Sequence, residues 1–182
     1  MSELPSTSYA LLGLLSFGRE LTGYDLKKWA DSFLRHFYGS PAMSIIYTEL
    51  KRLEEHGFVT ARDVPTDEVR HKRVDAITPA GRTALASWVR HAPVEAPSLK
   101  HSVAFRVLLG DLVEPERLTE IVEEHKAHTE TVLEELRRME GTTDPGLAYP
   151  RLVIRWSQRD HEHERAAADQ LLRELSVLAK RR

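Results

Sequence analysis

Apolar residues recur with helical spacing along most of the first half of the chain. They are dense over residues 9–15 and return every three or four positions in two later stretches. This spacing predicts three helices, at about residues 6–17, 23–34 and 41–56. In the third predicted helix, Ile46, Leu50 and Leu53 share one side, which leaves the opposite side polar.

Short polar motifs mark where these helices begin and end. Thr22 and Asp25 have the spacing of a capping box, in which each side chain accepts a hydrogen bond from the backbone N–H of the other residue. Ser40 followed by Pro41 is typical of a helix start. Gly57 suits the left-handed conformation that closes a helix. These motifs agree with the boundaries predicted from the apolar spacing.

Two β-rich runs follow the third predicted helix. Residues 58–64 and 69–77 flank a short polar stretch, and this arrangement predicts a β-hairpin. Thr78 and Pro79 then start a fourth helix, which is expected to end before Pro93.

The second half of the chain has helical spacing only, after a boundary marked by Pro93 and Pro97. Two domains are therefore expected, at residues 1–92 and 98–182. Helices are predicted in the second domain at about residues 99–110, 115–140 and 147–179. The last helix would be about 50 Å long, so its apolar stripe is expected to need a second chain. The residues of this expected dimer clasp are Leu171, Leu175 and Leu178 in the last helix and Leu118, Ile121, Val122, Leu133 and Leu136 in the one before it.

The fold class that follows is mainly α with a small β-hairpin. Composition then excludes several classes of function. The chain has 182 residues, a net charge of −2 and no cysteine, which excludes disulfides, thiol catalysis and cysteine-bound metals. No apolar run approaches the roughly 20 residues of a membrane span, and the N-terminus has no basic region ahead of an apolar one. We therefore expect a cytoplasmic protein with no membrane partner.

Three helices followed by a β-hairpin are the layout of a winged helix-turn-helix, whose third helix enters the DNA major groove while the hairpin, or wing, touches the backbone. Ser44 and Thr48 on the polar side of the third helix are candidates for reading base edges. Cationic residues on that helix and on the second wing strand are candidates for phosphate contacts, namely Lys51, Arg52, Arg70, Lys72 and Arg73. Tyr47 has two open roles, packing beside the core or hydroxyl contact with a phosphate. Double-stranded DNA is the expected partner.

Four segments of the first half form a specific combination, namely Tyr9-Ala-Leu-Leu-Gly-Leu-Leu, Thr22-Gly-Tyr-Asp-Leu-Lys, the run from Ser44 to Gly57, and Ile77-Thr-Pro-Ala-Gly-Arg82. In this combination the chain resembles the PadR family of bacterial transcriptional regulators. The resemblance implies a winged helix-turn-helix repressor with a helical C-terminal dimerisation domain and regulation by a small molecule. The long C-terminal part is similar to the subfamily of phenolic-acid-responsive repressors. A homodimer with a small aromatic or phenolic effector is thus implied.

Aromatic residues are the best candidates for contact with an effector. Trp88, Tyr149 and Trp156 could border a cleft between the two domains, where small ligands often bind. Arg155 or His161 could meet a carboxylate there. The open alternative is that both tryptophans only pack the junction between the domains.

Other function classes find less support in the sequence. The chain has no glycine-rich phosphate loop, no Gly-x-Ser-x-Gly elbow and no His-Glu-x-x-His, so neither an enzyme nor a cofactor is expected. A metal-responsive regulator is an alternative, because His125 and His128 lie three residues apart on a helix. Glu124 or His161 could complete such a site, although nothing fixes a third partner, and no metal is expected. A winged-helix module that binds protein is a further alternative, against which the basic residues argue.

Overall fold

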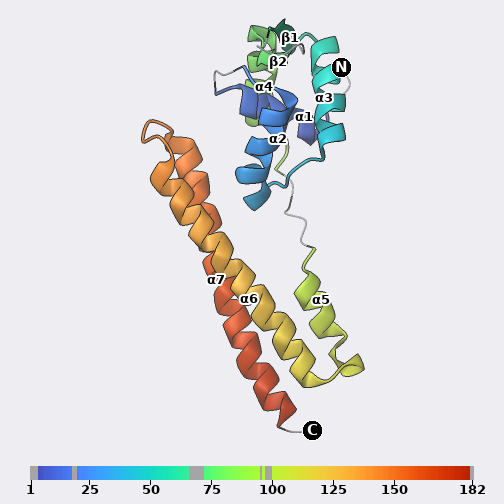
Figure 1. Cartoon of the computed structure of the whole chain (residues 1–182), viewed down its shortest axis with the longest axis vertical. Helices are drawn as coiled ribbons and strands as arrows, with labels where there is room; N and C mark the ends of the chain where they lie inside the picture. The colour runs from blue at the N-terminus through green and yellow to red at the C-terminus, as the bar shows by residue number, and fades with distance from the viewer. Residues whose placement is uncertain (1–3, 18–19, 66–71, 95, 97–99, 181–182) are drawn as a thin grey trace. The chain divides into compact units, whose positions relative to one another are not determined.

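The structure is a computed structural model of the chain (Figure 1). It describes all residues except 1–3, 18–19, 66–71, 95, 97–99 and 181–182. The chain divides into two compact units, Met1–Ala96 and Pro97–Arg182. Each unit is described by itself.

Helices and one antiparallel hairpin make up the described part of the first unit. In chain order the elements are α1 (Ser6–Leu15), α2 (Gly23–Ser32), the 3₁₀ helix η1 (Leu34–His36), α3 (Met43–Glu55), β1 (Val59–Val64), β2 (Lys72–Ile77) and α4 (Pro79–His91). The predicted fold class and the order of three helices, a hairpin and a fourth helix are confirmed.

The core of the first unit is built around α1. This helix is apolar on most sides, and Leu11, Leu12 and Leu15 are fully buried. Helix α3 contributes one side only, through Ile46 and Leu53, which are also fully buried. Burying one such side chain stabilises the fold by about 1.5–3 kcal/mol. The core therefore fixes which side of α3 faces outward.

Local capping sets some of these helix boundaries. Thr22 Oγ1 accepts a hydrogen bond from the backbone N–H of Asp25, and an Asp25 carboxylate oxygen accepts one from the backbone N–H of Thr22. The predicted capping box is thus confirmed. Gly57 has a φ of +69°, as predicted for the residue that closes α3.

The predicted helix start at Ser40 is wrong. Helix α3 begins at Met43 without a side-chain cap. Ser40 Oγ instead donates a 2.6 Å hydrogen bond to Asp31 Oδ1 and accepts one of 3.0 Å from Lys27 Nζ. These contacts hold Ser40 against α2, so its hydroxyl does not cap α3.

The wing hairpin is fastened to the segment before α2. Strands β1 and β2 pair from Val59 opposite Ile77 to Val64 opposite Lys72. Two backbone hydrogen bonds, of 3.0 and 2.8 Å, join Leu21 to Asp75 of β2. Residues 66–68 of the predicted turn lie outside the described residues.

The second unit is helical throughout its described part. It comprises α5 (Ser102–Leu108), the 3₁₀ helix η2 (Gly110–Leu112), α6 (Pro115–Thr142) and α7 (Ala148–Ala179). Helices α6 and α7 run side by side and antiparallel (Figure 1). Among the described residues, no helix has the length and apolar character needed to cross a membrane.

The apolar stripes of the two long helices meet within one chain. Leu118, Leu133 and Leu136 of α6 are buried, as is Leu175 of α7. The prediction that these residues need a second chain is therefore wrong, because the turn between α6 and α7 folds one stripe onto the other. Leu178, near the end of α7, remains 56% exposed.

Candidate DNA interface

The outward side of α3 carries the residues predicted to read DNA bases. Ser44 and Thr48 are exposed, and 78% of the Lys51 side chain is exposed. Thr48 Oγ1 donates a 2.9 Å hydrogen bond to the Ser44 carbonyl oxygen one turn earlier. Because its proton is used within the helix, the hydroxyl oxygen presents its lone pairs to an outside donor.

A buried carboxylate fixes α3 against α1. Glu49 is only 6% exposed, and Ser8 Oγ donates a hydrogen bond to its Oε2. Arg52 Nη2 lies 3.6 Å from Glu49 Oε1. A buried carboxylate without partners would be destabilising, so these contacts support the inward position of Glu49. Arg52, a predicted phosphate contact, thus already has a partner on its own helix.

Tyr47 lies across the start of α2. A Cβ atom added to Gly23, the first residue of α2, would lie 2.7 Å from Tyr47 Cε1, so only glycine leaves room for the ring in this position. The tyrosine is nevertheless 53% exposed. Tyr47 therefore packs against α2 on one side and faces outward on the other, which keeps both of its predicted roles open.

The two described cations of β2 have different surroundings. Lys72 is half exposed, and its Nζ lies 3.8 Å from Asp25 Oδ2. Arg73 is held by two carboxylates, because its Nη2 donates hydrogen bonds of 2.9 Å to both Asp75 Oδ1 and Glu54 Oε2. Arg70 lies outside the described residues. Lys72 is therefore better placed than Arg73 to meet a phosphate.

Asp75 is the buried carboxylate that holds the wing hairpin in position. It is 1% exposed, and its burial raises its pKa above the ordinary value, while the hydrogen bonds from Arg73 oppose that rise. Removing one partner of a buried ion pair leaves an uncompensated charge. Arg73 thus neutralises Asp75 and, through Glu54, ties β2 to α3.

A hollow of about 240 Å³ opens where α2, α3 and β2 meet. Tyr24, Tyr47 and Lys72 line it, together with the first residues of α2 and the paired, mutually offsetting charges of Arg73 and Asp75. The start of a helix carries a partial positive charge, and Lys72 adds a full one, which Asp25 offsets in part. The hollow suits a singly anionic group that approaches from outside.

Comparison with known proteins shows which family the first unit resembles. Residues 11–87, from α1 into α4, match the sequence profile of the Transcriptional regulator PadR-like family. The first unit of the chain is therefore similar to the PadR-like family over this stretch. The resemblance predicted from the four sequence segments is confirmed over this stretch.

The relatives of this PadR-like chain extend the comparison. The negative transcriptional regulator PadR of Bacillus subtilis (strain 168) is 39% identical over 87 residues, which are 47% of this chain and 47% of that protein. The aligned stretch thus spans about half the length of that curated relative. The crystal structure of Bacillus subtilis PadR in complex with operator DNA has a TM-score of 0.80 and 21% identity, with 94% of this chain and 99% of that chain covered. The crystal structure of the same protein in complex with p-coumaric acid has a TM-score of 0.70 and 20% identity, with 93% and 98% covered. The predicted winged helix and helical second part are therefore confirmed as a PadR-like fold.

The residues predicted to contact an effector are distributed over both units of the PadR-like chain. In the first unit, Trp88 stacks on Tyr9 with ring centroids 4.8 Å apart. In the second unit, Tyr149 and Trp156 of α7 are 82% and 74% exposed. The polar candidates have partners, since Arg155 Nε donates a 2.6 Å hydrogen bond to Glu140 Oε1 and His161 Nδ1 lies 2.8 Å from the Ser157 carbonyl oxygen.

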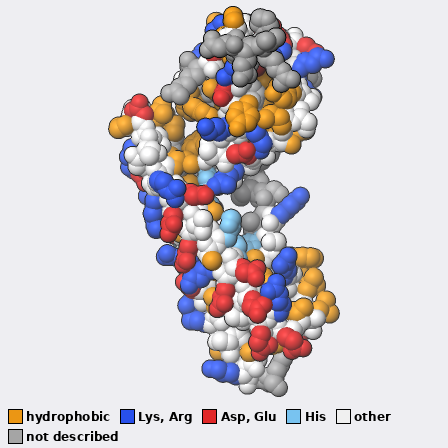
Figure 2. Space-filling view, in the orientation of Figure 1, with side chains coloured by type: hydrophobic (Ala, Val, Ile, Leu, Met, Phe, Trp, Pro, Cys, Tyr) orange, Lys and Arg blue, Asp and Glu red, His pale blue; other side chains and the backbone are white. Residues whose placement is uncertain are grey.

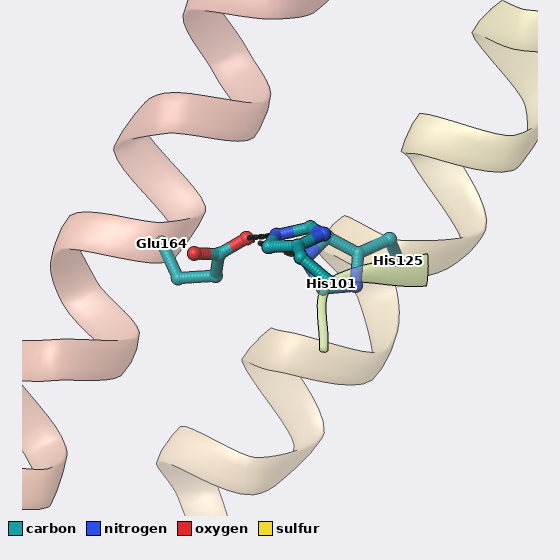
Figure 3. Close-up of side chains that lie close together, drawn as sticks. All are labelled: His101, His125 and Glu164. Carbon is teal, nitrogen blue, oxygen red and sulfur yellow. Dashed lines mark hydrogen bonds and ion pairs between the residues drawn. The ribbon is translucent and has the colours of Figure 1, made fainter. Parts of the chain in front are cut away.

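The structure does not pair His125 with His128, the alternative metal site considered from the sequence. His128 is exposed, whereas His125 turns toward Glu164 of α7 and His101 at the start of α5 (Figure 3). The sequence analysis missed His101 and Glu164. Helical spacing relates residues within one helix, so it carries no signal for a cluster assembled from three helices.

Proposed function

We propose that this PadR-like chain is a homodimeric repressor that binds a pseudo-palindromic operator and is released from it by a small aromatic or phenolic effector. The carrying observation is the exposed polar side of α3, which lies beside the half-exposed Lys72 of the wing. The protein described as Bacillus subtilis PadR forms a complex with operator DNA, and it has the same fold. A regulator of this kind acts in the cytoplasm, where the DNA is.

In the proposed complex, α3 reads bases and the wing contacts the backbone. Thr48 presents a hydroxyl oxygen that accepts, so it suits the amino group of adenine or cytosine. Ser44 lies one turn earlier on the same exposed side. Lys51 and Lys72 are the most available phosphate contacts, and the hollow beside Lys72 is where a phosphate would sit. The remaining candidates are Arg52, Arg70, Arg73 and the Tyr47 hydroxyl.

The homodimer is proposed to form through apolar side chains that the second unit leaves exposed. Hydrophobic side chains gather along the edge formed by α5 (Figure 2). There, Phe105, Leu108 and Leu112 are 63%, 77% and 79% exposed. Two copies related by a twofold axis would present two α3 helices to successive major grooves, about 34 Å apart. Each subunit would read one half of the operator.

The effector is proposed to weaken operator binding by preferring the free repressor. The Bacillus subtilis PadR of known structure forms a complex with p-coumaric acid. In this chain, Trp88, Tyr149 and Trp156 offer aromatic faces, and Arg155 or His161 could meet a carboxylate. A ligand that bound the free and DNA-bound states equally would not change operator affinity, so a differential affinity is required.

The test is an electrophoretic mobility shift with the purified protein. The probe is the DNA immediately upstream of its own coding region, and unrelated DNA of equal length is the competitor, at about 0.15 M salt, where non-specific binding is weak. A discrete complex that resists the competitor is expected, and p-coumaric acid is expected to reduce it. Genome-wide fragments replace the probe if it gives no complex. Absence of any preferred fragment would contradict the proposed function.

A further inference from the structure

Three side chains from three separate segments of the second unit meet at one point (Figure 3). His101 lies at the N-terminal end of α5, His125 in α6 and Glu164 in α7. The Nε2 atoms of the two histidines lie 2.7 and 2.8 Å from the same oxygen, Glu164 Oε1. All three possible ligand atoms lie within 4.8 Å of one another.

The cluster is partly shielded from solvent, and its Glu164 carboxylate is kept charged. The two histidine side chains are each 23% exposed and the Glu164 side chain is 35% exposed. Burial raises the pKa of Glu164, but the hydrogen bonds from His101 and His125 outweigh this effect and leave the pKa below its ordinary value. The cluster therefore combines one anionic oxygen with two imidazole nitrogens, all pointing toward one another (Figure 3).

We propose that His101, His125 and Glu164 bind one divalent transition-metal ion of the Zn²⁺ type. Two imidazoles and a carboxylate form a donor set that suits Zn²⁺, Co²⁺ and Ni²⁺ and is less suited to Mg²⁺ or Ca²⁺, which prefer oxygen ligands. Three protein ligands leave a fourth position for water or another small ligand. This site is separate from the α3 surface, and the proposal does not rest on the proposed function.

The two contacts between nitrogen and oxygen need only a small adjustment to admit the ion, and the two nitrogens lie within 4.8 Å of each other. Ligand atoms about 2.1 Å from a tetrahedral Zn²⁺ are about 3.4 Å apart. The two nitrogens now lie 2.7 and 2.8 Å from the carboxylate oxygen, so each gap must open by about 0.6 Å. Rotations about the side-chain bonds of these partly exposed residues supply such a movement.

Metal binding at His101 is coupled to the start of α5. The Ala104 N–H donates a 3.1 Å hydrogen bond to His101 Nδ1, so in the metal-free neutral ring the proton lies on Nε2 and faces Glu164. A metal on Nε2 replaces that proton, and the neutral ring then carries its proton on Nδ1. The cap of α5 is lost as a result. One capping hydrogen bond contributes much less free energy than zinc binding by three protein ligands. Zinc binding at His101 is therefore favoured over the cap.

The bound ion would join three helices that apolar packing and ion pairs such as Lys126–Asp169 already hold together. It would fix the start of α5 to the α6–α7 hairpin, and the second unit would unfold at a higher temperature when metal is present. This predicts that a metal-loaded chain differs from a metal-free chain in stability, in addition to binding the ion.

The experiment uses the full chain freed of metal with a chelator that is then removed. Zn²⁺ affinity is measured by competition with a chromophoric chelator, and Co²⁺ is added separately to record its visible absorption spectrum. We expect one ion per chain, a Co²⁺ spectrum typical of tetrahedral coordination, and a higher unfolding temperature with Zn²⁺.

Two variants test the ligands without removing the fold. Glu164→Gln keeps the shape of the side chain but removes its charge, and His101→Asn keeps an acceptor able to cap α5 but removes the imidazole. Each is expected to weaken Zn²⁺ binding at least tenfold and to abolish the Co²⁺ spectrum. His128→Ala and His163→Ala, which change exposed histidines on the same two long helices, should bind like the unmodified chain.

Three results would overturn the proposal. The first is no Zn²⁺ binding by the unmodified chain, and the second is equal binding by the Glu164→Gln and His101→Asn variants. The third is loss of binding in the His128→Ala or His163→Ala control, since the ion would then lie at other histidines. In each case the cluster would be a metal-free hydrogen-bonded contact between helices. Operator binding is measured separately, so failure of this proposal leaves the proposed function standing.

Discussion

Gly81 of α4 is a position where one added methyl group should weaken the whole first unit. A Cβ atom there would lie 2.2 Å from the Phe58 carbonyl oxygen and 3.0 Å from Ile77 Cγ1. Ordinary contacts between carbon and oxygen are about 3.3 Å or longer, so Gly81→Ala forces α4 and the start of β1 apart by about 1 Å. The same carbonyl accepts a 3.0 Å hydrogen bond from the Thr78 N–H, which the shift would strain.

The magnitude follows from these contacts. Overpacking of this kind destabilises by about 1–3 kcal/mol, and a strained hydrogen bond adds up to about 1 kcal/mol. The better helix propensity of alanine returns at most about 1 kcal/mol. Gly81→Ala should therefore lower the free energy of unfolding by about 1–3 kcal/mol.

Gly13→Ala is the matched control. Gly13 lies inside α1, and a Cβ atom there would meet nothing within 4 Å. This substitution should stabilise by about 0.5–1 kcal/mol, because only the helix propensity changes. Urea unfolding followed by circular dichroism compares the two variants through the midpoint, provided that the slope stays constant. A Gly81→Ala variant as stable as the unmodified chain would refute the reasoning.

Two further predictions concern the DNA surface, and a third concerns the cap of α2. Lys72→Ala should weaken binding to all DNA sequences about equally and reduce the slope of log K against log salt by about one, whereas Lys126→Ala in the second unit should leave the slope unchanged. Thr48→Ala should change base preference within the operator, measured by binding to single-base operator variants. Because hydrogen bonds from Thr22 hold the pKa of Asp25 below 3.8, its ionised carboxylate stabilises α2 above that pH, and the contribution disappears as the pH falls through the lowered pKa. The stability difference between the unmodified chain and Asp25→Asn should therefore shrink in acid, as unfolding measured across the pH range would reveal.

The elements that sequence analysis predicted well are those fixed by local interactions. The Thr22 capping box and the left-handed Gly57 depend on residues within one helical turn, and both occur as predicted. The third helix shows the same principle, since the spacing of Ile46 and Leu53 sets its buried side and therefore its outward side.

The features that sequence analysis missed depend on residues far apart along the chain. The position of Ser40 in the sequence suits a helix cap, but its hydroxyl forms hydrogen bonds with Lys27 and Asp31 instead. Arg73 looks like any exposed cation in the sequence. It shares one side of β2 with Asp75, but only the fold buries Asp75 and brings Glu54 of α3 to the same guanidinium. Periodicity therefore predicts neither the contacts of Ser40 nor the burial of Asp75.

The leucine stripe of α7 has a consequence for where two copies would meet. An apolar stripe on a long helix needs a partner, but its sequence does not say whether the partner is another segment of the chain or another chain. Here α6 supplies it, because Leu133 and Leu136 are buried within one copy. Association of two copies must then draw on apolar side chains that remain exposed, such as Phe105 and Leu108 of α5. The interior of the hairpin therefore stabilises the fold of one copy, and the proposed pairing of two copies is left to the edge along α5.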